Sequence, residues 1–266
     1  MPDLSQYKEW LLLRDRSPTT IHNYCSVIQQ YYSKYHGDIV EFKRHLRSFS
    51  DGYRNFCINA IKSYYRFSGQ EIDSEVFSLI RVRDSHRTLI PVDTVQDTVD
   101  CLRPHHRATK DVVSWRNYCI VGMFAYTGIR PTQLCNILVS DISPDGSVYI
   151  GGIKREAAHR VWPIPKLYRA IMRYVSLSGL RPGDRLFPIG RERVREIVLE
   201  LTGFNPKDFR TTFAIEYLKR LRELGISDIR KVQKALGHNS ILSTEIYLDL
   251  LDELEQKSSE VGLYEY

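Results

Sequence analysis

The sequence predicts a mainly helical fold with one small antiparallel sheet, arranged as two domains. Hydrophobic residues recur at spacings of three and four over most of the chain, as on one face of an α-helix. The stretch 147–164 is instead rich in valine, isoleucine and aromatic residues, which favour strands. A polar, charged segment near 82–92, with Pro91 in it, interrupts the helical pattern. We therefore divide the chain into residues 1–83 and residues 84–266.

The N-terminal part is expected to consist of successive helices. Ser17, followed by a proline, has the features of a helix N-cap with proline at the first helical position. Asp38 can cap a shorter helix, and Ser50 precedes a third, strong one. Gly69 ends this third helix, because glycine adopts the left-handed conformation of a helix C-terminus without strain.

The C-terminal part is expected to combine helices with a hairpin. A long helical pattern over about 109–126 stops at Gly128, and Pro131 suits the first turn of a short helix. The segments SVYIGGIK and HRVWPIP, separated by REAA, predict an antiparallel hairpin or part of a three-stranded sheet. Further helices are predicted over about 166–177, 191–202, 207–224, 228–236 and 241–257.

The composition is that of an intracellular, soluble protein. The chain has 266 residues, of which 42% are hydrophobic and 26% charged, so a core is available without low complexity. The five cysteines form no CxxC motif, and no apolar run approaches the length of a membrane span. The N-terminus lacks the basic start and apolar core of a signal peptide. We therefore expect a cytoplasmic location and no membrane association.

The charge balance suits a polyanionic partner, but only modestly. The net charge is +6 and the sequence pI is about 9.0. Basic side chains recur on the N-terminal helices, where they belong either to a solvated surface or to a surface that grips a nucleic-acid backbone: Lys34, Lys43, Arg44, Arg47, Arg54, Lys62 and Arg66.

Several cations and one tyrosine in the second part carry the chemical signal. They are Arg130 in TGIRPTQL, Lys154 in GGIKREAA, Lys207 and Arg210 in NPKDFRTTFA, and His238 and Tyr247 in LGHNSILSTEIY. Arginine keeps its charge and matches two phosphate oxygens, lysine can deliver a proton, and a fixed tyrosine is a usable nucleophile. No acidic cluster with metal-ligand spacing accompanies them, so we expect attack on a phosphodiester without a metal or other cofactor.

These motifs resemble the tyrosine recombinase and phage integrase family, which includes the Xer recombinases. TGIRPTQL is similar to the family's first arginine motif, and KDFRTTFA matches its HxxR motif at the arginine. LGHNSILSTEIY matches the LGH…Y ending with the same nine-residue separation, and Lys154 matches the family's hairpin lysine in order and surroundings. The resemblance covers most of residues 86–255. The N-terminal helices resemble the family's core-binding domain.

Three features depart from the family pattern. Lys207 replaces the histidine of HxxR, which helps to deprotonate the nucleophile, so Lys207 is either a base or, more simply, a phosphate clamp. Gln133 stands where an acidic residue commonly follows the first arginine. The stretch between Arg210 and His238 is several residues longer than usual.

The resemblance implies a two-domain clamp on double-stranded DNA: a helical core-binding domain and a catalytic domain that needs neither ATP nor metal. Tyr247 is expected to form a 3′-phosphotyrosyl link. Arg130, Arg210 and His238 are expected to stabilise the transition state, and Lys154 to protonate the departing 5′ oxygen. We expect a monomer or dimer free in solution and a homo-tetramer on synapsed DNA.

Several alternatives remain open at this level. The same chemistry serves a type IB topoisomerase, and an inactive DNA-binding relative or a structural helical protein could share parts of the pattern. The resemblance does not separate the integrase of a mobile element from a chromosome resolvase. The tail, residues 250–266, either docks on a neighbouring protomer or packs on its own domain.

Overall fold

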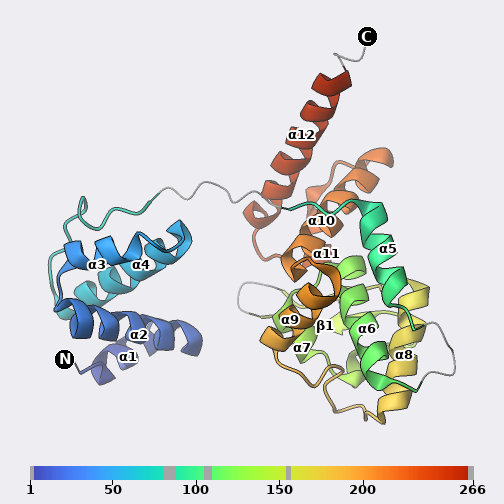
Figure 1. The fold of residues 1–266 in the computed structure, drawn as a ribbon, viewed down its shortest axis with the longest axis horizontal. Coiled ribbons are helices and arrows are strands. Elements are labelled where there is room, and N and C mark those ends of the chain that lie inside the picture. Colours follow the sequence, from blue (N-terminus) through green and yellow to red (C-terminus); the bar gives the residue numbers. More distant parts are fainter. Residues whose placement is uncertain (1–2, 81–87, 105–109, 154–156, 263–266) are drawn as a thin grey trace. The chain divides into compact units, whose positions relative to one another are not determined.

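The computed structural model describes the backbone of residues 3–80, 88–104, 110–153 and 157–262, with side chains as far as residue 256. Its contacts divide the chain into two units, Met1–His86 and Arg87–Tyr266, called unit 1 and unit 2 below (Figure 1). The boundary predicted after Arg83 falls on residues 81–87, which lie outside the described residues. The division into residues 1–83 and 84–266 therefore stays a prediction.

The described part of unit 1 contains α1 (Ser5–Leu12), α2 (Pro18–Tyr35), α3 (Ile39–Leu46) and α4 (Asp51–Ser68). The predicted capping residues begin these helices. The side chains of Ser17, Asp38 and Ser50 each accept a backbone N–H from the first turn of α2, α3 and α4. Gly69 ends α4 with a positive φ, as predicted. Local sequence therefore determines where these helices start and stop.

The core of unit 1 is aromatic. Tyr7, Tyr31 and Phe42 are fully buried, and the rings of Tyr7 and Tyr64 meet edge to face with their centroids 5.2 Å apart. Edge-to-face pairs add stability beyond the burial of their area. Helix α1 was not singled out by the sequence, because its buried face consists only of Tyr7 and Leu11.

Unit 2 is built around one central helix, α6 (Val112–Thr127), which is buried on nearly all sides. It packs against four other helices, as expected for a helix that is apolar all round. The other described helices of unit 2 are α5 (Val92–Leu102), α7 (Pro131–Asn136), α8 (Pro165–Ser178), α9 (Arg191–Thr202), α10 (Pro206–Glu223), α11 (Ile229–Leu236) and α12 (Leu242–Gly262).

Two differences from the predicted helices concern helix starts. Helix α5 begins directly after Pro91, which the sequence analysis interpreted only as a break. Proline destabilises a helix when it lies in the interior, but not when it lies at the first position or just before it. A proline that breaks a helix and one that precedes a helix therefore look alike in the local sequence. Helix α6 begins at Val112 with Asp111 as its cap, three residues after the predicted start.

A two-stranded antiparallel sheet is found where the hairpin was predicted. Strand β1 (Val148–Ile150) pairs with β2 (His159–Val161), with Val148 opposite Val161. A short 3-10 helix, η1 (Val139–Asp141), precedes it, and Ile142 adds an isolated bridge to β1. The prediction of a mainly helical fold with one small antiparallel sheet is confirmed.

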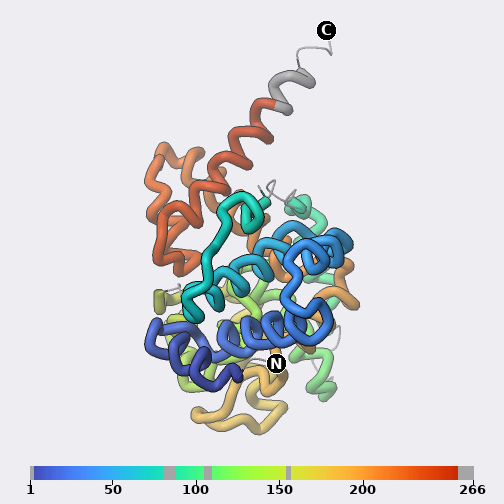
Figure 2. The backbone as a smooth tube through the Cα atoms, turned by 90° about the vertical axis from the view of Figure 1, so that its left-hand side faces the viewer, coloured from blue at the N-terminus to red at the C-terminus, as the bar shows by residue number. Residues whose placement is uncertain are grey.

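Helices α10, α11 and α12 enclose a second, smaller hydrophobic cluster in unit 2. It includes Leu236, Tyr247 and Leu251, all nearly or fully buried. The chain of α12 then leads away from the body of the unit (Figure 2). Arg222 at the end of α10 donates to the carboxylates of Asp252 and Glu255, at 2.6 Å each. As far as Glu255, α12 therefore packs on its own unit.

Candidate active site

Arg210 is the buried centre of the site. It lies in the first turns of α10, whose start is fixed by the Asp208 carboxylate accepting the Asn205 N–H at 2.9 Å. The Arg210 side chain donates to the carbonyls of Gly128 at 2.7 Å and Leu236 at 3.0 Å, and the residue is only 4% exposed. These carbonyls end α6 and α11, where the helix dipole is negative and favours a cation. Arg210 thus joins the ends of two helices.

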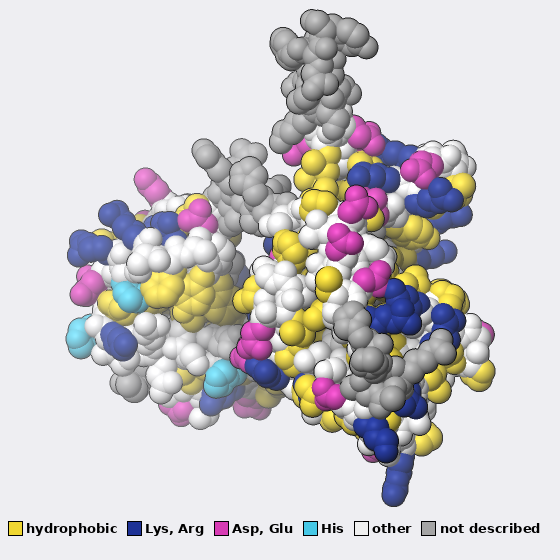
Figure 3. All heavy atoms as spheres, turned by 45° about the vertical axis from the view of Figure 1, so that its right-hand side comes forward, with side chains coloured by type: hydrophobic (Ala, Val, Ile, Leu, Met, Phe, Trp, Pro, Cys, Tyr) yellow, Lys and Arg dark blue, Asp and Glu magenta, His cyan; other side chains and the backbone are white. Residues whose placement is uncertain are grey.

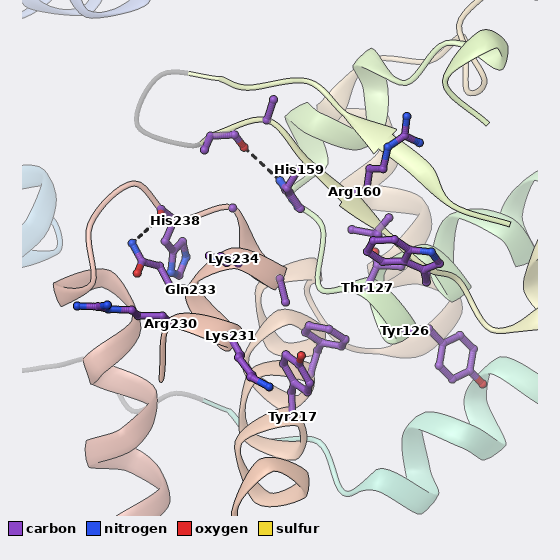
Figure 4. A pocket seen from close by; sticks show the side chains of 17 residues that line it. Tyr126, Thr127, His159, Arg160, Tyr217, Arg230, Lys231, Gln233, Lys234 and His238 are labelled. Carbon is purple, nitrogen blue, oxygen red and sulfur yellow. Dashed lines mark hydrogen bonds between the residues drawn. The ribbon is translucent and has the colours of Figure 1, made fainter. Parts of the chain in front are cut away.

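His238 lies against Arg210 in the turn after α11. Its Nε2 is 2.8 Å from Arg210 Nη2, and its Nδ1 is 2.8 Å from Thr244 Oγ1. A guanidinium can only donate, so the contact at Nε2 favours the neutral ring tautomer whose proton lies on Nδ1. Gly237 permits the turn with a φ of +69°. The Gln233 amide donates to the His238 carbonyl at 3.0 Å and fixes the backbone there (Figure 4).

Tyr247 meets His238 from α12. The two rings are stacked, with centroids 6.3 Å apart and planes within 5° of parallel. Tyr247 is only 4% exposed and belongs to the buried cluster of α10, α11 and α12. The structure therefore brings Arg210, His238 and Tyr247 together within one chain.

Arg130 is exposed at the start of α7. It lies two residues after Gly128, whose carbonyl accepts from Arg210. The Arg130 backbone N–H donates to Gln133 Oε1 at 3.2 Å, and Gln133 is buried. The amide that replaces the family's acidic residue thus holds the backbone at Arg130. The two predicted arginines differ in setting, one buried and one at the surface.

Of the two predicted lysines, only Lys207 lies within the described residues, and it stands outside this buried group. Lys207 is exposed in the first turn of α10, and its carbonyl accepts from the Thr211 hydroxyl at 3.1 Å. Lys154 lies in residues 154–156, outside the described residues. Strand β1 ends at Ile150, before the predicted strand end beside Lys154.

The chain that returns from the hairpin is attached to the turn carrying His238. The Ala157 N–H donates to the Gly237 carbonyl at 2.9 Å, and His159 Nδ1 lies 3.1 Å from the Ala157 carbonyl (Figure 4). A Cβ at Gly237 would lie 2.4 Å from His159 Nδ1, so only glycine fits. Ala157 and His159 are therefore held beside the turn that carries His238.

A pocket of about 810 Å³ opens beside His238. It is lined by aromatic side chains and by cations from β2 and α11 (Figure 4). These are Tyr126, Trp162, Phe213 and Tyr217, with Arg160, Arg230, Lys231 and Lys234. Lys and Arg side chains gather in patches on unit 2, between hydrophobic ones (Figure 3). Such surroundings favour a negatively charged occupant.

The sequence analysis missed several of these residues. Arg230, Lys231 and Lys234 recur on one side of α11, a pattern that the sequence offers but that was not used. Thr244 and His159 carried no signal, because their importance comes from contacts across turns. Among the described residues, no group of three His, Cys, Asp or Glu side chains could hold a metal ion. None of the helices in the same residues is long and apolar enough to cross a membrane.

Comparison with known families identifies the chain. Residues 105–253, more than half of it, match the phage integrase family. The chain belongs to the phage integrase family. The matched region contains Arg130, Lys154, Lys207, Arg210, His238 and Tyr247.

Curated members of the family extend the match over almost the whole chain. The tyrosine recombinase XerA of Thermococcus kodakarensis is 25% identical over 97% of this chain and 94% of its own length. The tyrosine recombinase XerC of Bacillus subtilis is 24% identical over 74% of this chain and 70% of its own. The chain is therefore a tyrosine-type site-specific recombinase.

Solved structures of family members share the fold. A crystal structure of XerA recombinase aligns with 99% of this chain and 98% of its own, with a TM-score of 0.53 and 23% identity. The XerH recombinase in a post-cleavage complex with its palindromic difH substrate covers 94% of this chain and 81% of its own, with a TM-score of 0.69 and 15% identity. A lambda integrase tetramer bound to a Holliday junction covers 92% and 75%, with a TM-score of 0.65 and 15% identity.

Proposed function

We propose that this recombinase cuts and rejoins double-stranded DNA at a specific site through a 3′-phosphotyrosyl intermediate on Tyr247. The observation that carries the proposal is one chain of contacts: Tyr247 stacks on His238, and His238 Nε2 lies 2.8 Å from Arg210 Nη2. A phenol, an imidazole and a buried guanidinium in contact are the parts that attack on a phosphodiester requires.

The reaction exchanges one phosphoester for another. The Tyr247 oxygen forms a bond to phosphorus as its proton passes to solvent, and the bond from phosphorus to the 5′ oxygen breaks. Lys154 supplies the proton that the departing 5′ oxygen takes up. The covalent link keeps the energy of the broken bond, so a 5′-hydroxyl of the partner strand can reverse the step without ATP.

The cations divide the stabilisation of phosphate charge between them. Arg130 is exposed and positioned by the cap of α7, so it reaches the nonbridging oxygens. Arg210 is held rigidly by two carbonyls and His238, and supplies a fixed positive charge that needs no rearrangement during the reaction. Lys207 lies in the first turn of α10, where the helix dipole also attracts an anion, which favours its role as a phosphate clamp over that of a base.

Tyr247 needs a small movement before it can react. With 4% exposure, it cannot meet a phosphate from where it lies. We infer that DNA binding rotates the Tyr247 side chain out of its buried position so that the phenol faces the scissile phosphate.

The N-terminal region, residues 1–83, is proposed to be the core-binding domain that grips the duplex. A pocket of about 490 Å³ in unit 1 is lined by Arg14, Arg16 and Arg66, together with other polar and aromatic residues. The Arg14 guanidinium lies 3.8 Å from the centre of the Trp10 ring. A cation held on an aromatic face beside two further arginines suits a DNA backbone phosphate.

We propose that residues 84–266 form the catalytic domain and that four copies assemble on two synapsed DNA sites, with a monomer or dimer in solution. Since α12 is tied to its own unit through Asp252 and Glu255, any docking on a neighbour falls to residues beyond these. A location in the cytoplasm follows from this DNA substrate.

Covalent trapping tests the proposal. Wild type and Tyr247→Phe are incubated with nicked suicide substrates made from candidate attachment sites, and products are separated under denaturing conditions. We expect a protein–DNA adduct with wild type only, and phosphotyrosine at residue 247 by mass spectrometry.

The remaining alternatives predict different products. Relaxation of supercoiled plasmid without a specific site indicates a type IB topoisomerase. DNA binding without any adduct indicates an inactive relative, and absence of salt-dependent DNA binding removes DNA as the partner.

A further inference from the structure

Thr244 occupies an unusual place beside the proposed nucleophile. It is fully buried in the first turn of α12, three residues before Tyr247, so both side chains lie on one side of the helix. Its hydroxyl oxygen lies 2.8 Å from His238 Nδ1. The imidazole is thus held from α12 twice, by this hydrogen bond and by the stacked Tyr247 ring.

The hydrogen-bond directions give Thr244 a defined task. Arg210 Nη2 faces His238 Nε2 and can only donate, so Nε2 must remain without a proton. The neutral ring then carries its proton on Nδ1 and needs an acceptor in a place from which water is excluded. The Thr244 oxygen is that acceptor. Losing it removes a stabilising partner of the Nδ1 proton and so weakens the tautomer preference that Arg210 favours from the other side of the ring.

We propose that Thr244 is a positioning residue that sets the tautomer of His238. It thereby keeps the His238 ring in the orientation that contacts both Arg210 and Tyr247. It acts through His238 and does not touch the substrate. The inference rests on the proposed function for its effect on DNA cleavage, but its effect on the histidine ring does not depend on that function.

The test compares two substitutions with opposite chemistry. Thr244→Val keeps the shape of the side chain and removes the hydroxyl, whereas Thr244→Ser keeps the hydroxyl and removes a methyl. Loss of the outer hydrogen-bond partner of a metal-bound histidine typically costs about 10- to 100-fold in affinity or activity. By analogy, we expect a loss of this size in adduct formation for Thr244→Val and near wild-type rates for Thr244→Ser. Thr202→Val in α9, whose hydroxyl donates to the Val198 carbonyl, controls for losing a helix-bound hydroxyl.

Long-range ¹H–¹⁵N correlation spectra of the histidine rings in the full-length protein measure the tautomer directly. The His238→Asn variant identifies the His238 signal among those of the eight histidines. We expect a protonated Nδ1 and an unprotonated Nε2 in wild type and in Thr244→Ser, and loss of this preference in Thr244→Val. A wild-type ring protonated on Nε2 overturns the inference without any variant. So does a Thr244→Val protein that keeps the wild-type tautomer, or a Thr244→Ser protein more impaired than Thr244→Val, which would indicate packing alone. If wild type forms no adduct, the proposed function fails while the spectra still decide the role of Thr244.

Discussion

Replacing Gly237 by alanine should damage the site through the hairpin rather than through the catalytic side chains. The new Cβ would lie 2.4 Å from His159 Nδ1 and 3.1 Å from the Ala157 carbonyl oxygen. The His159 side chain must therefore move, and the backbone at Ala157 must shift away from residue 237. The same change forces alanine into a φ of +69°, which costs about 1–2 kcal/mol by itself.

A matched variant separates these two contributions. Gly179 ends α8 with a φ of +66°, and a Cβ there meets nothing within 4 Å. Gly179→Ala therefore carries the backbone strain alone. In Gly237→Ala, losing the hydrogen bond between Ala157 and Gly237 lowers the free energy of unfolding by about 1 kcal/mol more than in Gly179→Ala. The Tm of Gly237→Ala should therefore fall by about 2–4 °C more than that of the control.

The activity difference should exceed the stability difference. Misplacing a catalytic group by about 1 Å can cost about 100-fold in rate, so we expect Gly237→Ala to form adduct about 10- to 100-fold more slowly than Gly179→Ala. Thermal melts and single-turnover trapping on the same DNA measure both quantities. Equal melting temperatures and equal cleavage rates for the two variants would refute the coupling of hairpin and His238 turn.

Three further predictions concern the cations. Arg210→Ala removes a preorganised donor and should slow adduct formation about 100- to 1000-fold, measured by trapping; Arg210→Lys should not restore the rate, because one ammonium cannot reproduce the planar fork. Arg222→Ala should cost about 1 kcal/mol or less in thermal melts at low salt and nothing at high salt, since Arg222 and its two partners, Asp252 and Glu255, are each more than a third exposed. The double variant Arg14→Ala, Arg16→Ala should weaken DNA binding and flatten the slope of log affinity against log salt concentration by about 0.9 for each lost phosphate contact. The control is Arg193→Ala, whose partners are Glu196 and Glu200, and it should leave this slope unchanged.

The helices and their ends were largely predictable from local sequence. Ser17, Asp38 and Ser50 begin their helices and Gly69 ends one because capping depends on a residue and its nearest neighbours along the chain. The start of α5 was missed because Pro91 fits a break and a helix start equally well.

The six proposed catalytic residues were also named from their motifs and spacing, but the sequence treated Arg130 and Arg210 as equivalent donors. In the fold, Arg130 lies at the surface, whereas Arg210 is buried against the carbonyls that end α6 and α11. No local pattern indicates which of two arginines will be enclosed, because enclosure depends on helices far apart in the chain.

The sequence by itself determined the helical class and the hairpin, since both follow from neighbours a few positions away. It also allowed the catalytic cations and the tyrosine to be proposed, from the order and spacing of their motifs. Only the tertiary structure decided that Thr244 faces His238, that His159 fills the space beside Gly237, and that the phenol of Tyr247 is enclosed by α10, α11 and α12. Those contacts depend on how three helices and a hairpin pack together, and packing is set by shapes and hydrogen-bond partners that meet only once the chain has folded.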